Sequence, residues 1–109
     1  MNKDPFLFID HILESINAIT KYIENVSKED FFNSEKTQDA ICRRLEIIGE
    51  AANKLDSEFT EQYPNIPWSK IVGMRNLLIH EYFNVDLDQV WNTVKKNIPE
   101  LKKQISKIK

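Results

Sequence analysis

Apolar residues recur at intervals of three and four along almost the whole chain, and this spacing predicts helices. Only two glycines and four prolines occur among the 109 residues, which argues against the turn-rich sequence of a β fold. A chain of this length is long enough to bury one hydrophobic core and too short for two. We therefore expect one all-α domain over residues 1–109, an antiparallel bundle of four main helices with short helices between them.

Capping residues mark where the expected helices begin. Asp4 followed by Pro5 predicts the start of a first helix of about six turns. Residues 27–30 resemble a capping box that opens a short helical turn, and Ser34 is placed to cap the second long helix. Another short helix is expected over residues 57–63.

The last two long helices carry the remaining signals. Pro67 is expected to begin the third, and Asp86 with Gln89 resembles a capping box for the fourth. Pro99 lies inside the fourth helix and should bend it, because the backbone bond to residue 95 is lost. Gly49 interrupts the apolar stripe of the second helix at a cost of about 1 kcal/mol relative to alanine. It suggests the close approach of another backbone or of a ligand, and the spacing alone favours packing.

The composition is that of an ordinary globular protein, with 41% hydrophobic and 29% charged residues. The single cysteine, Cys42, cannot form an intrachain disulfide, the acidic N-terminal segment is unlike a signal peptide, and no apolar run is long enough to span a bilayer. We therefore expect a cytoplasmic protein. The net charge is −2, and a cluster of lysines near the end of the chain permits RNA as a partner without indicating it: Lys95, Lys96, Lys102, Lys103, Lys107 and Lys109.

Residues 71–82 place four polar side chains on an otherwise apolar helix: Arg75, Asn76, His80 and Tyr82. A cation that stays charged, beside a group that titrates near neutral pH, suits phosphate chemistry. The ribose 2′-hydroxyl of RNA is an internal nucleophile, so a protein that cleaves RNA need only move protons and stabilise charge. In that reaction His80 is the candidate general base or acid and Arg75 the candidate phosphate ligand.

Two further residues have supporting roles in this hypothesis. Asn76 is placed to orient the histidine, and Tyr82 to hydrogen-bond to a base or stack on it. On an ideal helix Arg75 and His80 lie about 140° apart around the axis. Either the helix loosens where residues 81–84 lead into a loop, or a second subunit brings its own copy of the motif alongside.

The structural alternative is that Arg75 forms a salt bridge with Glu81 or another acid, while His80 packs at the edge of the bundle. Other candidate residues favour structural roles. His11 has no partner at metal-ligand spacing, and helix capping explains Asp86 more simply than a cation site does. Cys42 is expected to be a small core residue. No metal or cofactor site is indicated, and the sequence contains no glycine-rich phosphate loop.

Together these segments resemble the HepT-like family of HEPN-domain toxins over nearly the whole chain. The R-x4-H-x-Y signature of that family is met by Arg75, His80 and Tyr82 without departure. The surrounding segments that carry the resemblance are residues 44–52, 66–68, 73–76, 80–83, 85–86 and 90–91.

The resemblance implies an all-α HEPN-like bundle that forms a homodimer, with the motif helices lining a cleft between subunits. It also implies a metal-independent endoribonuclease toxin in which Arg75 and His80 are catalytic. Its partner would be a small nucleotidyltransferase antitoxin that transfers AMP from ATP to Tyr82, where the added phosphate would block RNA. The residues alone leave a second hypothesis open: a non-catalytic helical module that binds a nucleotidyltransferase or a nucleotide.

Overall fold

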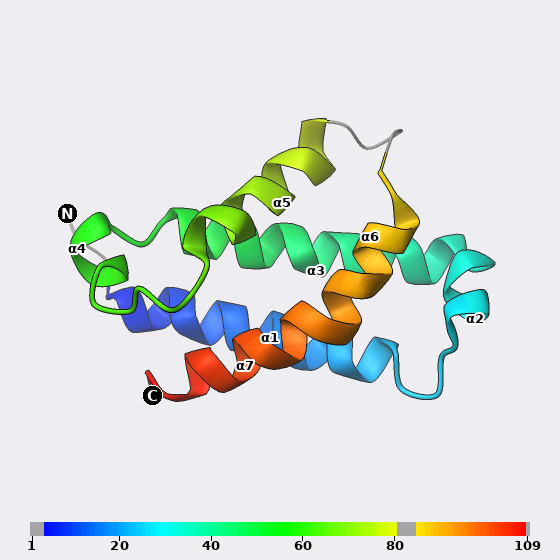
Figure 1. Cartoon of the computed structure of the whole chain (residues 1–109), viewed down its shortest axis with the longest axis horizontal. Helices are drawn as coiled ribbons and strands as arrows, with labels where there is room; N and C mark the ends of the chain where they lie inside the picture. Colours follow the sequence, from blue (N-terminus) through cyan, green and yellow to red (C-terminus); the bar gives the residue numbers. More distant parts are fainter. Residues whose placement is uncertain (1–3, 81–84, 109) are drawn as a thin grey trace.

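A computed structural model describes residues 4–80 and 85–108, and within these ranges all regular structure is helical. The two longest helices, α1 (Pro5–Tyr22) and α3 (Glu35–Asn53), run antiparallel and pack against each other. A short helix, α2 (Lys28–Phe32), connects them at one end (Figure 1). The α1–α3 pair is the base on which the other helices lie.

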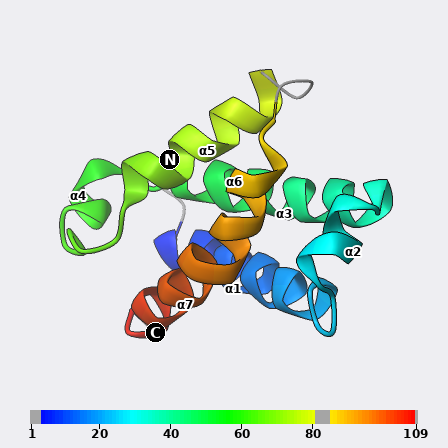
Figure 2. The same ribbon diagram turned by 45° about the vertical axis from the view of Figure 1, so that its right-hand side comes forward.

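The rest of the chain packs against this base in two parts, one before and one after residues 81–84. After the short α4 (Ser57–Thr60), helix α5 (Trp68–His80) lies across α3. The C-terminal segment consists of α6 (Leu87–Asn92), a π-helical turn (Thr93–Asn97) and α7 (Ile98–Ser106), and α7 packs on α1. Figure 2 shows α5 and the C-terminal segment close together at the top of the view and diverging from each other below it. The expected all-α bundle with four main helical segments is confirmed.

The expected helix caps are confirmed. The Asp4 side chain accepts from the Phe6 N–H, and the Ser34 side chain accepts from the Thr37 N–H. The capping box at Ser27 is complete in both directions with Asp30 as its second member. Each cap satisfies a backbone N–H that the first turn of a helix would otherwise leave without an acceptor.

Two helices are shorter than the sequence predicts. The first ends at Tyr22 after 18 residues, which is short of the expected length of about six turns, and beyond it Asn25 adopts a left-handed conformation with φ of 59°. Asparagine tolerates this conformation better than most residues, so it suits the end of a helix. The short helix expected over residues 57–63 covers only Ser57–Thr60, capped by Asp56.

Pro99 changes the last helical segment in a different way from the expected simple bend. The backbone widens into a π-helical turn just before it, where the Ile98 N–H donates to the Thr93 carbonyl five residues back. A proline ring collides with the carbonyl four residues earlier and cannot donate to it. The wider turn relieves this conflict and lets the apolar face continue from Val94 to Leu101.

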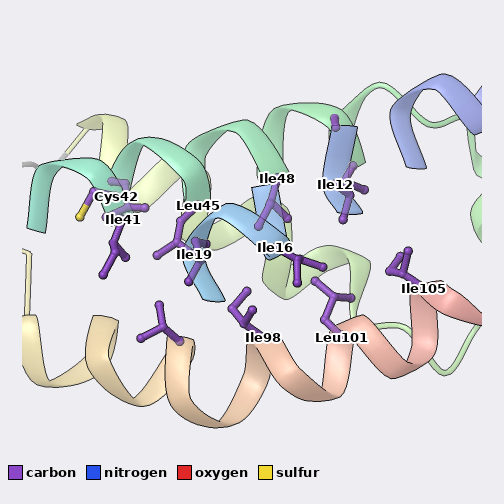
Figure 3. Packing of buried hydrophobic residues seen from close by; sticks show 14 of the residues in the cluster. Ile12, Ile16, Ile19, Ile41, Cys42, Leu45, Ile48, Ile98, Leu101 and Ile105 are labelled. Carbon is purple, nitrogen blue, oxygen red and sulfur yellow. The ribbon is translucent and has the colours of Figure 1, made fainter. Parts of the chain in front are cut away.

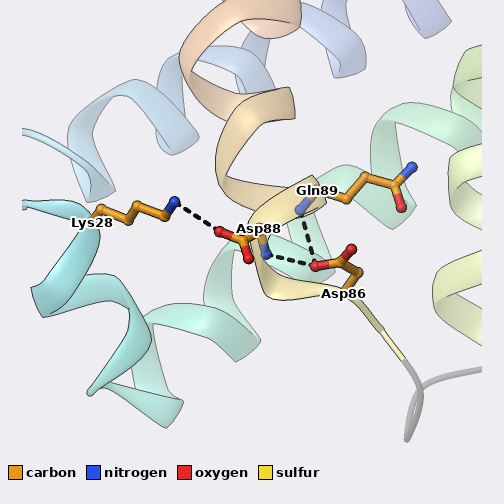
Figure 4. A network of polar contacts seen from close by, with 4 residues as sticks. All are labelled: Lys28, Asp86, Asp88 and Gln89. Carbon is orange, nitrogen blue, oxygen red and sulfur yellow. Dashed lines mark hydrogen bonds and ion pairs between the residues drawn. The ribbon is translucent and has the colours of Figure 1, made fainter.

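Asp86 begins the segment as a helix cap, which confirms the structural interpretation over a cation site. Its Oδ1 accepts from the backbone N–H groups of Asp88 and Gln89, at 2.9 and 3.4 Å (Figure 4). The carboxylate of Asp88 pairs with Lys28 of α2 at 2.7 Å. Both partners of this ion pair are more than half exposed, so it contributes little to stability.

The core forms where the apolar faces of α1, α3 and α7 meet. Four isoleucines of α1 are completely buried in it, and Figure 3 shows that three of them, Ile12, Ile16 and Ile19, lie among apolar residues of α3 and α7. The isoleucines are Ile9, Ile12, Ile16 and Ile19. In the part of the chain that the structure describes, none of the helices is both long and apolar enough to cross a membrane.

Among residues 4–80 and 85–108, Ser15 is the one polar side chain that is buried, at 1% exposure. Its hydroxyl has no hydrogen-bond partner. A buried polar group without a partner costs about 1–3 kcal/mol of desolvation.

We predict that Ser15→Ala raises the free energy of unfolding by about 1 kcal/mol, because it removes that cost and favours the helix. The matched control is Ser34→Ala, which deletes the α3 cap and should lower the free energy by about 1 kcal/mol. Urea denaturation measures both. A loss of stability in Ser15→Ala would show that the hydroxyl makes a stabilising contact.

Candidate active site on helix α5

Helix α5 carries many apolar residues, yet few of its residues are fully buried. Of its 13 residues only Leu78 is fully buried, and Ile79 is 40% exposed. Trp68 holds the start of the helix, because its indole Nε1 donates to the Tyr63 carbonyl at 3.1 Å. Its packing is against α3. Part of the apolar surface of α5 is therefore left uncovered within the described chain.

Arg75 lies on the side of α5 that faces α3 and is partly buried. Its Nη1 donates to the Asn76 Oδ1 at 2.8 Å, and its Nε is buried without a hydrogen-bond partner. No carboxylate among residues 4–80 and 85–108 lies within ion-pair distance of it. Glu81, the acid named in the structural alternative, lies outside the described residues.

The contact between Arg75 and Asn76 corrects one expectation. The sequence suggested that Asn76 would orient His80, but its amide oxygen accepts from the guanidinium instead. This bond holds the Nη1 side of the guanidinium, and the Nε on its other side is buried, so only the remaining Nη donors could bind an anion.

Gly49 of α3 lies directly beneath Arg75. A methyl group on Gly49 would overlap the Cβ of Arg75 and lie 2.8 Å from its Cγ and 3.1 Å from the Ile71 carbonyl oxygen. The expectation that packing explains this glycine is confirmed. The missing side chain lets α5 approach α3 closely at the position that carries the arginine.

His80 is the last residue of α5 and is exposed rather than packed at the edge of the bundle. The helix is regular from Trp68 through His80, so ideal geometry keeps Arg75 and His80 about 140° apart. Within the described residues the helix does not loosen to bring them together. Tyr82, and the segment at 81–84 where loosening was expected, lie outside the described residues.

A groove between α5 and the C-terminal segment was not anticipated from the sequence. Its volume is about 640 Å³, with Leu45 and Ile48 of α3 among its apolar lining. The wall from the C-terminal segment includes the polar residues Gln89, Thr93 and Asn97 and also the apolar residues Ile98 and Leu101. The spacing of four between Gln89, Thr93 and Asn97 was the signal in the sequence that could have indicated a shared polar face. The groove itself exists only because α5 diverges from this segment. Arg75 is not among its lining residues.

The other candidate residues take structural positions. Cys42 is buried in the core, and burial, then Glu46 and Asp39, raise the pKa of its thiol to about 11. It is therefore protonated at neutral pH and unsuited to act as a nucleophile. His11 is exposed on α1, with its ring edge-on to Phe8. No group of three metal-binding side chains occurs among the described residues.

Comparison with known proteins identifies the family. The model of the family described as "Ribonuclease HepT-like" matches residues 12–108. A Methanocaldococcus jannaschii protein named as a gamma-glutamylcyclotransferase and candidate RNase is 50% identical over 99% of this chain, which spans 49% of that protein. A candidate RNase of Caldanaerobacter subterraneus is 42% identical over 97% of this chain and 95% of its own length. A protein of Thermococcus cleftensis named as a ribonuclease HepT is 41% identical over 94% of this chain and 93% of its own length.

This chain thus spans about half of the first relative, which is named for two activities, and nearly all of the other two. No solved structure matches it significantly. The family match covers α1 from Ile12 onward, the whole of α3 with the glycine beneath Arg75, and the whole of α5. The chain belongs to the HepT-like ribonuclease family.

Proposed function

We propose that this protein is a metal-independent endoribonuclease in which Arg75 and His80 carry the chemistry. The observation that supports it most is the state of these two side chains. His80 is exposed, and Arg75 is held by Asn76 without an ion pair to any described carboxylate. Among the residues that the structure describes, neither side chain has the structural partner that would make the motif accidental.

In the proposed reaction the 2′-hydroxyl oxygen of a ribose attacks the adjacent phosphorus. His80 accepts the hydroxyl proton or protonates the departing 5′-oxygen, the P–O5′ bond breaks, and a 2′,3′-cyclic phosphate remains. The guanidinium of Arg75 stabilises the negative charge on the nonbridging oxygens. The nucleophile belongs to the substrate, so the reaction requires no metal-bound water.

The proposal includes a homodimer, since a single regular α5 directs Arg75 and His80 to different sides. Two motif helices facing each other would place Arg75 of one subunit near His80 of the other. The uncovered apolar side of α5, with Ile79 40% exposed, supports an interface at this helix.

The proposal also includes regulation as the toxin of a toxin–antitoxin pair. A nucleotidyltransferase antitoxin would catalyse attack of the Tyr82 hydroxyl on the α-phosphorus of ATP, releasing pyrophosphate and leaving AMP on the tyrosine. The added negative charge, two residues from His80, would repel RNA and occupy a cation of the site. This part rests on the family resemblance.

We expect the purified protein to cleave single-stranded RNA in EDTA, and His80→Ala to slow cleavage by about 10²–10⁴-fold through loss of proton transfer. The matched control is His11→Ala, which changes the only other histidine, also exposed and on α1. Initial rates on a fluorescent oligonucleotide provide the measurement. Equal rates for wild type and His80→Ala would identify a contaminating nuclease, and wild-type protein that cuts no RNA would favour the non-catalytic binding module.

A shared site predicts complementation between two inactive variants. Arg75→Ala and His80→Ala subunits, mixed and allowed to exchange, form heterodimers in which one of the two sites is intact. With random exchange the mixture should regain about one quarter of the wild-type activity, although each variant alone is inactive. If exchange is verified by tagged subunits and no activity returns, both residues act within one subunit and the shared site is wrong.

Regulation at Tyr82 is tested with a nucleotidyltransferase of the proposed antitoxin class, supplied with ATP. Intact mass should rise by one AMP in wild type and in Tyr22→Phe, an exposed tyrosine of α1, but not in Tyr82→Phe. The modified protein should lose RNA cleavage. Undiminished cleavage by fully modified protein would exclude this form of control.

A further inference from the structure

Gly49 has a defined relation to one side chain of the proposed site. It lies in the interior of α3, is buried, and faces the aliphatic stem of Arg75 and the Ile71 carbonyl. A glycine in a helix interior costs about 1 kcal/mol relative to alanine. This cost to α3 occurs at the position where α5 packs an arginine against it.

The space at Gly49 cannot be recovered by a change of rotamer. The first atom that a methyl group would overlap is the Cβ of Arg75, which is fixed to the backbone of α5, and the Ile71 carbonyl is backbone as well. Carbon atoms pack at about 3.5–4.0 Å, so α5 would have to move away from α3 by on the order of 1 Å.

The guanidinium would move with the helix, because its position is set from its stem. Its Nε is buried between the helices and its Nη1 is bonded to the neighbouring Asn76. Displacing a catalytic group by about 1 Å can reduce the rate by about 100-fold.

We infer that Gly49 is a positioning residue for Arg75. The absence of a side chain at Gly49 sets the distance between α5 and α3 and thereby the position of the guanidinium. This inference rests on the proposed ribonuclease function for its kinetic consequence but not for the contact itself. Gly49 touches no substrate in this account and acts only through Arg75.

The second glycine of the chain provides a matched control. Gly73 lies in α5, two residues before Arg75, and a methyl group there would meet nothing within 4 Å. Both glycines are helical and lie close to the same arginine. Gly49→Ala and Gly73→Ala therefore add the same methyl group, once against Arg75 and once into open space.

The first arm of the test measures stability and needs no activity. Gly49→Ala should lower the urea midpoint, whereas Gly73→Ala should keep or raise it. In the Arg75→Gly background the overlap with the arginine stem is gone, so Gly49→Ala/Arg75→Gly should be no less stable than Arg75→Gly alone. If Gly49→Ala lowers the midpoint equally in both backgrounds, the contact with Arg75 is not what requires glycine and the inference fails.

The second arm measures RNA cleavage at a temperature where circular dichroism shows each variant folded. Gly49→Ala should lower kcat by about 100-fold with KM changed less than about threefold, because a displaced guanidinium stabilises the transition state poorly. Gly73→Ala should retain wild-type kinetics. In single-turnover reactions Gly49→Ala should cause no further loss in the Arg75→Gly background.

Three outcomes distinguish the claims. Full activity in folded Gly49→Ala would overturn the positioning role, as would an equal loss in the Arg75→Gly background. If Gly49→Ala does not fold, recovery of folding in Gly49→Ala/Arg75→Gly would support the contact, and failure to recover would refute it. If wild-type protein cleaves no RNA, the proposed function fails, and the stability arm still decides whether Gly49 sets the position of Arg75.

Discussion

The close approach of α5 to α3 is the contact on which the candidate site depends. Helix α5 buries only one residue completely, so its position is determined by what lies beneath it rather than by a core of its own. At the centre of that contact Gly49 leaves room for the stem of Arg75. The α1–α3 core therefore supports a partly uncovered helix, and the side chains proposed to carry the chemistry lie on that helix.

Much of the fold could be predicted because its signals are local. Helix starts are encoded by single capping residues such as Asp4, Ser34 and Asp86, and helix type by the spacing of apolar residues. The π-helical turn could not be predicted in the same way. A proline requires that the preceding backbone be relieved, but a bend and a widened turn both achieve this, and the choice depends on packing against α1.

The candidate site was predictable in chemistry and less so in geometry. Residue types and spacing identify Arg75 and His80, and helix geometry alone shows that one subunit directs them apart. That Asn76 binds the arginine rather than orienting the histidine could not be known, since both lie within its reach on a helix. The glycine signal at position 49 was visible, but its partner was not, because that contact joins residues far apart in the sequence.

The chemical ends of the RNA products test the central claim most directly. Attack by the 2′-hydroxyl, assisted by His80 and Arg75, leaves a 2′,3′-cyclic phosphate on one fragment and a 5′-hydroxyl on the other. We predict these ends for the wild-type protein in EDTA, identified by mass spectrometry of a short synthetic RNA. Fragments with a 3′-hydroxyl and a 5′-phosphate would require water as the nucleophile, and they would contradict the mechanism assigned to these residues.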